Sequence, residues 1–176
     1  MAHQFIFYKM VALSKKNLLI LFITKGASAN YTFELNSNIF SQNTATENGG
    51  CLYLSQTSSS GIISIINDSF INNVINNSMS SVGSIILLSD PANISIENSY
   101  FLNNIGILGT CIYYGESRRY FMLNLKNNIF ENNKARLGAG GLFIQDNYDK
   151  ILPYENNQFM GNSAGFCNFL LKPFSN

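Results

Sequence analysis

Charged residues are scarce in this chain: Asp, Glu, Lys and Arg make up 12% of its 176 residues, against about 25% in an average globular protein. The formal net charge is +1, which excludes a basic nucleic-acid binder held by phosphate contacts and an acidic tail protein. The single histidine, His3, lies outside the repeats described below and is assigned no role. Hydrophobic residues make up 46% of the chain, which is enough for the core of one domain.

Asparagine, in contrast, is abundant, and the reason lies in an internal repeat. A phenylalanine followed three residues later by an asparagine recurs at intervals of 29 to 31 residues. The five pairs are Phe40 and Asn43, Phe70 and Asn73, Phe101 and Asn104, Phe130 and Asn133, and Phe159 and Asn162. A single F-x-x-N is uninformative, but five in register indicate a repeat architecture, because a disordered Asn-rich chain would not keep a phenylalanine in register.

The residues around each pair repeat as well. Apolar residues stand five and seven positions before each phenylalanine, as Ile65 and Ile63 do before Phe70, and this alternation is typical of a strand with one buried face. After each F-x-x-N come a glycine, a second apolar run and a polar loop, as in the segment 109–120. Each unit therefore predicts three short strands joined by Asn turns, which is one coil of a parallel β-helix.

The repeat predicts an all-β fold, a right-handed parallel β-helix (solenoid) with one coil for each of its about five units. Coils in such a fold stack about 4.8 Å apart, so that equivalent residues lie above one another. We expect the five phenylalanines to stack inside the solenoid. We expect the five paired asparagines to form a ladder in which each amide hydrogen-bonds to the next. Asparagine also tolerates the left-handed backbone conformation that turns require.

Residues 1–30 precede the repeat domain, which we place at residues 31–176. The apolar run Leu18 to Ile23 follows two lysines and precedes Ala27-Ser28-Ala29, which is the pattern of a secretory signal with a cleavage site. The same run also fits the closing strand of a partial coil or N-terminal cap. A transmembrane helix is not expected, because it would bury lysines at about 3 kcal/mol each.

The motifs F-x-x-N and G-G-x-x resemble the repeats of chlamydial polymorphic outer membrane proteins. The second motif is intact at Gly49-Gly50 and Gly140-Gly141 and degraded in the other repeats. The resemblance covers about residues 31–171 and implies a right-handed β-helix of the pectin-lyase-like superfamily, displayed on a surface and used in adhesion. Since we see no cap beyond Pro173, and an uncapped coil exposes strand edges, we expect the chain to be a fragment of a larger repeat protein.

Cys51, Cys111 and Cys167 begin the strand after the glycine in alternate coils. Alternate coils are about 9.6 Å apart by the sheet spacing, which is too far for a disulfide. We interpret these cysteines as small core residues rather than as a disulfide or a metal site.

Charges alternate in sign from coil to coil, as at Glu97, Lys126 and Glu155. Alternation is typical of axial salt bridges, whereas a catalytic cleft would bring carboxylates together. We assign no catalytic residue, no metal ligand and no cofactor. Among the N-x-S/T sequons, Asn76 and Asn93 lie in predicted loops and are the better candidates for glycosylation.

The strand after the glycine is apolar on both faces. One predicted column holds Tyr53, Leu87, Tyr113, Ile144 and Phe169, and its neighbour holds Leu52, Ile86, Ile112 and Phe143. Only one column can point inward, so the other would form an apolar stripe covered by a segment of the chain or by a partner. Residues 1–17 are the candidate cover.

Together these features predict a non-enzymatic β-helix module of an extracellular or cell-surface protein, acting as an adhesive or spacer rod. A protein or glycan ligand would bind the surface of the rod, no nucleic acid is expected, and a membrane would be reached only through other parts of a parent protein. The alternative is a carbohydrate-active β-helix enzyme of the polysaccharide lyase or hydrolase type, which would need carboxylates converging on a cationic group in a groove.

Overall fold

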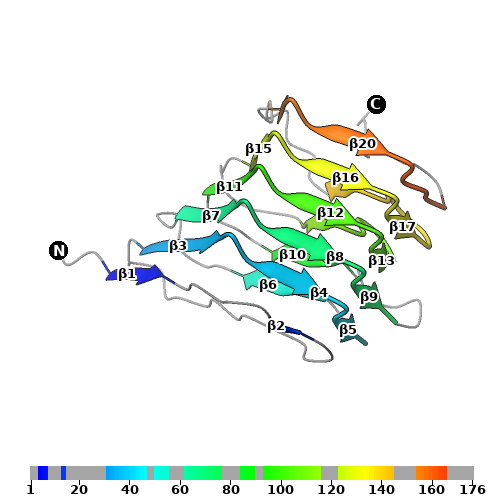
Figure 1. Ribbon diagram of the computed structural model, residues 1–176, viewed down its shortest axis with the longest axis horizontal. Coiled ribbons are helices and arrows are strands. Elements are labelled where there is room, and N and C mark those ends of the chain that lie inside the picture. The colour runs from blue at the N-terminus through cyan, green and yellow to red at the C-terminus, as the bar shows by residue number, and fades with distance from the viewer. Residues whose placement is uncertain are drawn as a thin grey trace.

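The computed structural model describes residues 4–7, 13–14, 31–46, 50–55, 62–76, 84–89, 93–115, 123–144 and 154–165. Within these ranges the chain is all-β, with short strands and no helix. The strands pair in parallel, and successive turns of the chain stack in register as the coils of a β-solenoid (Figure 1). The predicted fold class, a parallel β-helix, is confirmed.

Four parallel sheets run along the solenoid. Sheet A contains β1 (Gln4–Phe7), β3 (Tyr31–Asn36), β7 (Ile62–Ile66), β11 (Asn93–Glu97), β15 (Leu123–Lys126) and β19 (Tyr154–Glu155). Sheet B contains β2 (Leu13–Ser14), β4 (Ile39–Ser41), β8 (Ser69–Ile71), β12 (Tyr100–Leu102), β16 (Ile129–Glu131) and β20 (Gln158–Met160). Sheet C contains β5 (Thr44–Ala45), β9 (Val74–Ile75), β13 (Ile105–Gly106) and β17 (Lys134–Ala135). Sheet D contains β6 (Leu52–Ser55), β10 (Ile86–Ser89), β14 (Ile112–Tyr114) and β18 (Leu142–Ile144).

Each complete coil has four strands rather than the predicted three. The additional strand has two residues and follows the ladder asparagine directly, as β9 follows Asn73. Its second residue points inward and is buried in every complete coil. Among the described residues, four coils have a strand in all four sheets, while β1 with β2 and β19 with β20 belong to a further coil at either end. The expected count of about five coils is therefore slightly high for complete coils.

Two corners in every coil turn the chain through a left-handed backbone conformation. The first corner follows the sheet A strand and the second follows the sheet B strand. The φ angle lies between 50° and 61° at Ser37, Gln42, Asn67, Asn72, Asn98, Asn103, Asn127, Asn132, Asn156 and Gly161. Asparagine enters this region more readily than other residues with a Cβ. The corners therefore account for part of the asparagine excess.

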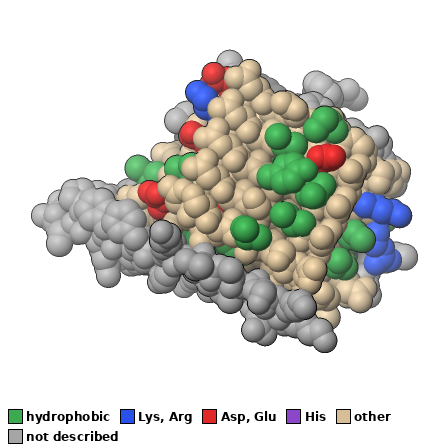
Figure 2. Space-filling view, in the orientation of Figure 1, with side chains coloured by type: hydrophobic (Ala, Val, Ile, Leu, Met, Phe, Trp, Pro, Cys, Tyr) green, Lys and Arg blue, Asp and Glu red, His purple; other side chains and the backbone are tan. Residues whose placement is uncertain are grey.

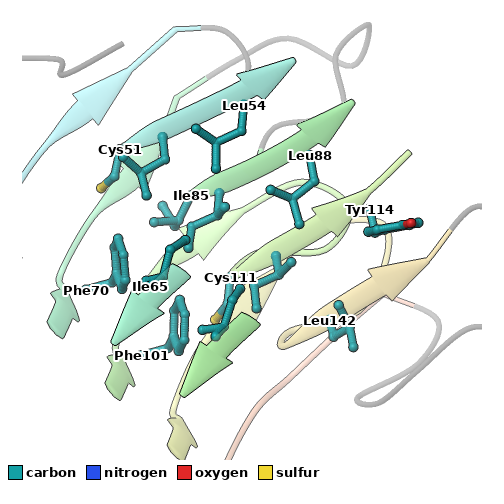
Figure 3. Packing of buried hydrophobic residues seen from close by; sticks show 14 of the residues in the cluster. Cys51, Leu54, Ile65, Phe70, Ile85, Leu88, Phe101, Cys111, Tyr114 and Leu142 are labelled. Carbon is teal, nitrogen blue, oxygen red and sulfur yellow. The ribbon is translucent and has the colours of Figure 1, made fainter. Parts of the chain in front are cut away.

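The interior is a column of stacked side chains (Figure 3). Alternate residues point inward, so that Ile63 and Ile65 of β7 are buried while Ile62 is exposed. The phenylalanines at 40, 70, 101, 130 and 159 stack one above the next, with ring centroids 4.6–4.9 Å apart and interplanar angles of 3–7°. This distance is the spacing of paired strands, so the stacking of the rings follows from the stacking of the coils.

Sheet D corrects the predicted alignment of one coil. Phe143 pairs with Tyr113, which shifts this coil by one residue from an alignment on Gly140. The inward column therefore holds Leu52, Ile86, Ile112 and Leu142, and the outward column holds Tyr53, Leu87, Tyr113 and Phe143. The physical reason is Gly141, where a Cβ atom would lie 2.9 Å from the ring of Phe159. A shift of one residue in the pairing of this coil places Gly141 beside the ring of Phe159. The same shift exchanges the inward and outward residues of the sheet D strand in this coil.

The outward column of sheet D is not an open apolar stripe. Leu87 and Tyr113 are each 5% exposed, so they are covered within the chain. The predicted cover was the segment 1–17, but its described residues lie in β1 and β2, which pair edge to edge with β3 and β4. They extend sheets A and B instead of lying over sheet D. The run Leu18 to Ile23 and Phe169 lie outside the described residues.

Candidate binding surface

The asparagine three residues after each phenylalanine belongs to a ladder at the corner between sheets B and C. The Oδ1 atom of Asn73 accepts the backbone N–H of Asn43 at 3.0 Å and its Nδ2 at 2.9 Å. The Nδ2 of Asn73 also donates to the carbonyl oxygen of Phe40 at 2.9 Å. The same bonds recur at Asn104, Asn133 and Asn162. All five side chains are buried, so the ladder satisfies backbone groups that water does not reach.

A second ladder at the corner between sheets A and B was missed by the sequence analysis. Its members stand two residues before each phenylalanine and are Asn38, Asp68, Ser99, Asn128 and Asn157. Asn157 Oδ1 accepts the backbone N–H and the Nδ2 of Asn128, each at 3.0 Å, which repeats the geometry of the first ladder. The available signal was a small polar residue in this position of all five repeats, but three different residue types obscured it.

Asp68 is an irregular member of the second ladder. Its Oδ1 accepts the backbone N–H of Asn38 at 2.7 Å and the Nδ2 of Asn38 at 2.9 Å, as an asparagine would. Its Oδ2 is buried and makes no hydrogen bond. Burial, only partly offset by the bonds from Asn38 and by the backbone of Ile66, raises the pKa of Asp68 from 3.8 to about 6. An asparagine here would place a donating Nδ2 where Asp68 has this unpaired oxygen.

The outer face of sheet A contains the predicted row of alternating charges. Lys126 lies between Glu97 and Glu155 in the register of the sheet, and its Nζ is 2.9 Å from Glu155 Oε2. The hydrogen bond to Glu155 raises the pKa of Lys126. Both side chains are well exposed, so this pair orders the surface more than it stabilises the fold. The charged loop residues near 90, 118 and 146 lie outside the described part of the chain.

The outer face of sheet B contains several exposed or half-buried apolar residues, and we call it the sheet B face. Its outward residues are Ile39, Ser41, Ser69, Ile71, Tyr100, Leu102, Ile129, Glu131, Gln158 and Met160. Ile39 and Met160 are 53% and 43% exposed. Figure 2 shows hydrophobic side chains gathered on the side that β4, β8, β12, β16 and β20 present in Figure 1. The face continues onto sheet C, where Ile105 is also exposed.

One polar pair lies in the middle of the sheet B face. The hydroxyl of Tyr100 donates to Glu131 Oε2 at 2.6 Å across two adjacent coils. This hydrogen bond raises the pKa of the Tyr100 phenol, so the phenol stays protonated near neutral pH and fixes the carboxylate. The exposed residues Lys134, in β17 of sheet C, and Arg136 follow Glu131 closely in the sequence. The face thus offers an apolar strip, an oriented carboxylate and nearby positive charge.

The two described cysteines, Cys51 and Cys111, do not form a reactive site. Cys51 and Cys111 are buried and unbonded to other cysteines, and Ile85 lies between them in the core. Burial raises the pKa of both thiols well above the usual value, which keeps them protonated and poorly nucleophilic. Cys167 lies outside the described residues.

The two glycosylation candidates lie on the surface. Asn76 follows β9 and Asn93 begins β11, and both side chains are exposed. Asn67, which begins another sequon, is the exposed left-handed residue of a corner. Its neighbour, Asp68, belongs to the second ladder.

In the described ranges, no three His, Cys, Asp or Glu side chains are grouped so that they could hold a metal ion. Among those same residues, no helix is long and apolar enough to span a membrane. Comparisons with family models, with curated proteins and with solved structures find no match to this chain. The chemistry of its own surfaces is therefore the basis for a functional proposal.

Proposed function

We propose that this chain is a non-enzymatic β-solenoid module that binds a protein ligand through the sheet B face and acts as an adhesive rod. The observation that supports this best is the apolar composition of an exposed, regular sheet surface. Four aliphatic residues, a methionine and a tyrosine lie on it in two parallel rows. Exposed apolar side chains gathered on one face usually mark an interaction site.

The composition of the face favours a protein over a glycan. Glycans stack on aromatic rings, and Tyr100 is the single aromatic residue among the outward side chains of sheet B. Aliphatic side chains around one hydrogen-bonded tyrosine are instead typical of protein interfaces. A glycan ligand is the alternative outcome of the test below.

The size of the face predicts a weak contact. Five strands about 4.8 Å apart give a length of about 20 Å, and three residues per strand give a width of about 10 Å. The resulting area of about 200 Å² is well below the roughly 800 Å² per partner of a stable complex. We expect a transient contact that gains strength when several modules or ligands are linked.

The setting of the module is part of the proposal. The F-x-x-N repeat supports a polymorphic-outer-membrane-type repeat of the pectin-lyase-like superfamily, with right-handed winding and an extracellular or cell-surface location. Exposed Asn76 and Asn93 are compatible with glycosylation in a secretory pathway. Within a longer parent protein, the stiff solenoid would hold the sheet B face away from the point of attachment.

A binding screen tests the proposal. The wild-type chain and a Leu102→Ser/Ile129→Ser variant are applied to arrays of extracellular proteins and of glycans. A control, Ile62→Ser, removes an isoleucine from the outer face of sheet A that is 50% exposed and therefore more accessible than Leu102 or Ile129. We expect protein ligands that bind the wild type and the control but not the face variant. Equal binding by all three chains, or cleavage of an arrayed polysaccharide, would contradict the proposal.

A further inference from the structure

Glu131 is the only charged residue among the ten outward residues of sheet B named above. In the register of the sheet it lies between Leu102 and Met160, and Figure 2 shows an acidic side chain among the hydrophobic ones on this side. The charged residue of sheet A at the same level is different, because Lys126 lies between two glutamates. The carboxylate of Glu131 therefore has apolar neighbours where Lys126 has charges of opposite sign.

The Glu131 carboxylate is held in place but not neutralised. The hydroxyl of Tyr100 donates to Oε2 at 2.6 Å, and Asn132 Nδ2 donates to Oε1 at 3.5 Å. Both donors are uncharged. Lys134 follows three residues later, but it lies beyond the corner in β17, and within the described part of the chain Glu131 forms no ion pair. Since a carboxylate has about four acceptor positions, both oxygens can still accept a further hydrogen bond.

Exposed asparagine side chains border the sheet B face on two sides. Asn98 and Asn127 lie at the corner between sheets A and B, where Asn127 Nδ2 donates to Asn98 Oδ1 at 3.0 Å. Asn103 and Asn132 lie at the corner between sheets B and C. An apolar centre with a polar border is the usual arrangement of a protein interface. In this interface the group that still lacks an oppositely charged partner is the carboxylate near the centre.

We propose that the ligand of the sheet B face presents an arginine flanked by aliphatic side chains, and that the guanidinium of this arginine binds Glu131. The inference rests on the proposed function, since it names the chemistry of the ligand at the same face. Arginine fits better than lysine because its planar guanidinium can donate to both carboxylate oxygens at once. It is also more weakly hydrated than an ammonium group, which favours a position beside Leu102 and Met160.

The probe is the peptide acetyl-Leu-Ser-Arg-Ser-Leu-amide, whose arginine and leucines point to one side when the peptide is extended. The control peptide has citrulline, an uncharged analogue of similar shape, in place of arginine. Binding to the full chain is followed by titration and by amide chemical shifts of the labelled protein. We expect saturable binding of the arginine peptide, with shifts at Leu102, Ile129 and Glu131. The citrulline peptide should bind about tenfold more weakly, because it cannot form the charged pair.

Glu131→Gln removes the charge and keeps the shape of the side chain. It should weaken binding of the arginine peptide about tenfold and remove the preference for arginine over citrulline. Glu97→Gln is the matched control. Glu97 is also half-buried and also accepts a hydroxyl hydrogen bond at 2.6 Å, from Ser95, but it lies on the outer face of sheet A. We expect this variant to bind the arginine peptide as the wild type does.

Three results would overturn the inference: equal binding of the two peptides, unchanged affinity in Glu131→Gln, or no saturable shift at millimolar arginine peptide. The binding screen separates the inference from the proposed function. An arrayed protein that binds the wild type and Glu131→Gln equally, but not the Leu102→Ser/Ile129→Ser variant, would support the proposed function and overturn the inference. Loss of that protein from both variants would support both.

Discussion

Replacing Asp68 with asparagine should stabilise this protein, although it changes a buried residue. The substitution keeps the Oδ1 acceptor for Asn38 and exchanges the unpaired Oδ2 for a donating amide. Two coils further along the same ladder, Asn128 Nδ2 donates to the carbonyl oxygen of Ile96 at 2.7 Å. The new amide would find the equivalent carbonyl at Leu35. A regular ladder would thus replace a buried carboxylate.

The magnitude follows from the pKa of Asp68. Burial raises this pKa from 3.8 to about 6, and each pKa unit corresponds to about 1.4 kcal/mol. Because the folded state binds the proton more tightly than the unfolded state, Asp68 destabilises the folded state fully above about pH 6 and not below about pH 4. We therefore expect Asp68→Asn to raise the free energy of unfolding by up to about 3 kcal/mol at pH 7 and by much less at pH 4.

Urea unfolding followed by circular dichroism at pH 4, 5, 6 and 7 measures this difference directly. Because every other titrating group is the same in wild type and Asp68→Asn, its contribution cancels in the difference between their free energies of unfolding at each pH. The reverse substitution, Asn128→Asp, is the control, and it should lose stability at pH 7 and recover part of it at pH 4. A difference between wild type and Asp68→Asn that does not change with pH, or a less stable variant at pH 7, would refute the reasoning.

Three further predictions, on the ring column, the ladder and the corners, are tested by the same unfolding measurement. Phe101→Ala should cost about 3–5 kcal/mol by opening a cavity in the ring column, whereas Thr44→Ala on the outside should cost less than about 0.5 kcal/mol; similar losses for both would argue against the column. Asn133→Ala removes the acceptor of Asn104 and a donor to the Phe101 carbonyl and should cost on the order of 3 kcal/mol; a loss below about 0.5 kcal/mol would mean that water replaces the ladder. At the left-handed corner residue Asn103, valine should cost about 1–2 kcal/mol and glycine almost nothing; equal stability of the two variants would contradict the corner geometry.

The parallel solenoid could be predicted because its repeat is long-range and regular. Five phenylalanines at nearly constant intervals leave few ways to bury every ring other than stacking them. The asparagine after each ring could be placed in a ladder for the same reason. These features depend on residue identity at fixed positions, which the sequence displays directly.

The remaining features depend on packing between coils. Each two-residue strand of sheet C buries one side chain, which is as small as alanine in Ala45 and Ala135. These strands therefore leave no run of apolar residues in the sequence. The shift at Gly141 is set by the ring of Phe159 in the next coil, which an alignment on glycines cannot reveal. The second ladder accepts Asn, Asp and Ser alike, because a single oxygen in the right place fulfils its main role.

Distances between aromatic rings test the central claim most directly. In a sample with labelled phenylalanine, nuclear Overhauser effects should connect the ring protons of Phe70 with those of Phe101, and those of Phe101 with those of Phe130, because the centroids lie 4.9 Å and 4.7 Å apart. Residues about thirty positions apart in the sequence have no other reason to touch. Ring contacts limited to neighbours in the sequence would contradict the stacked solenoid and the binding surfaces derived from it.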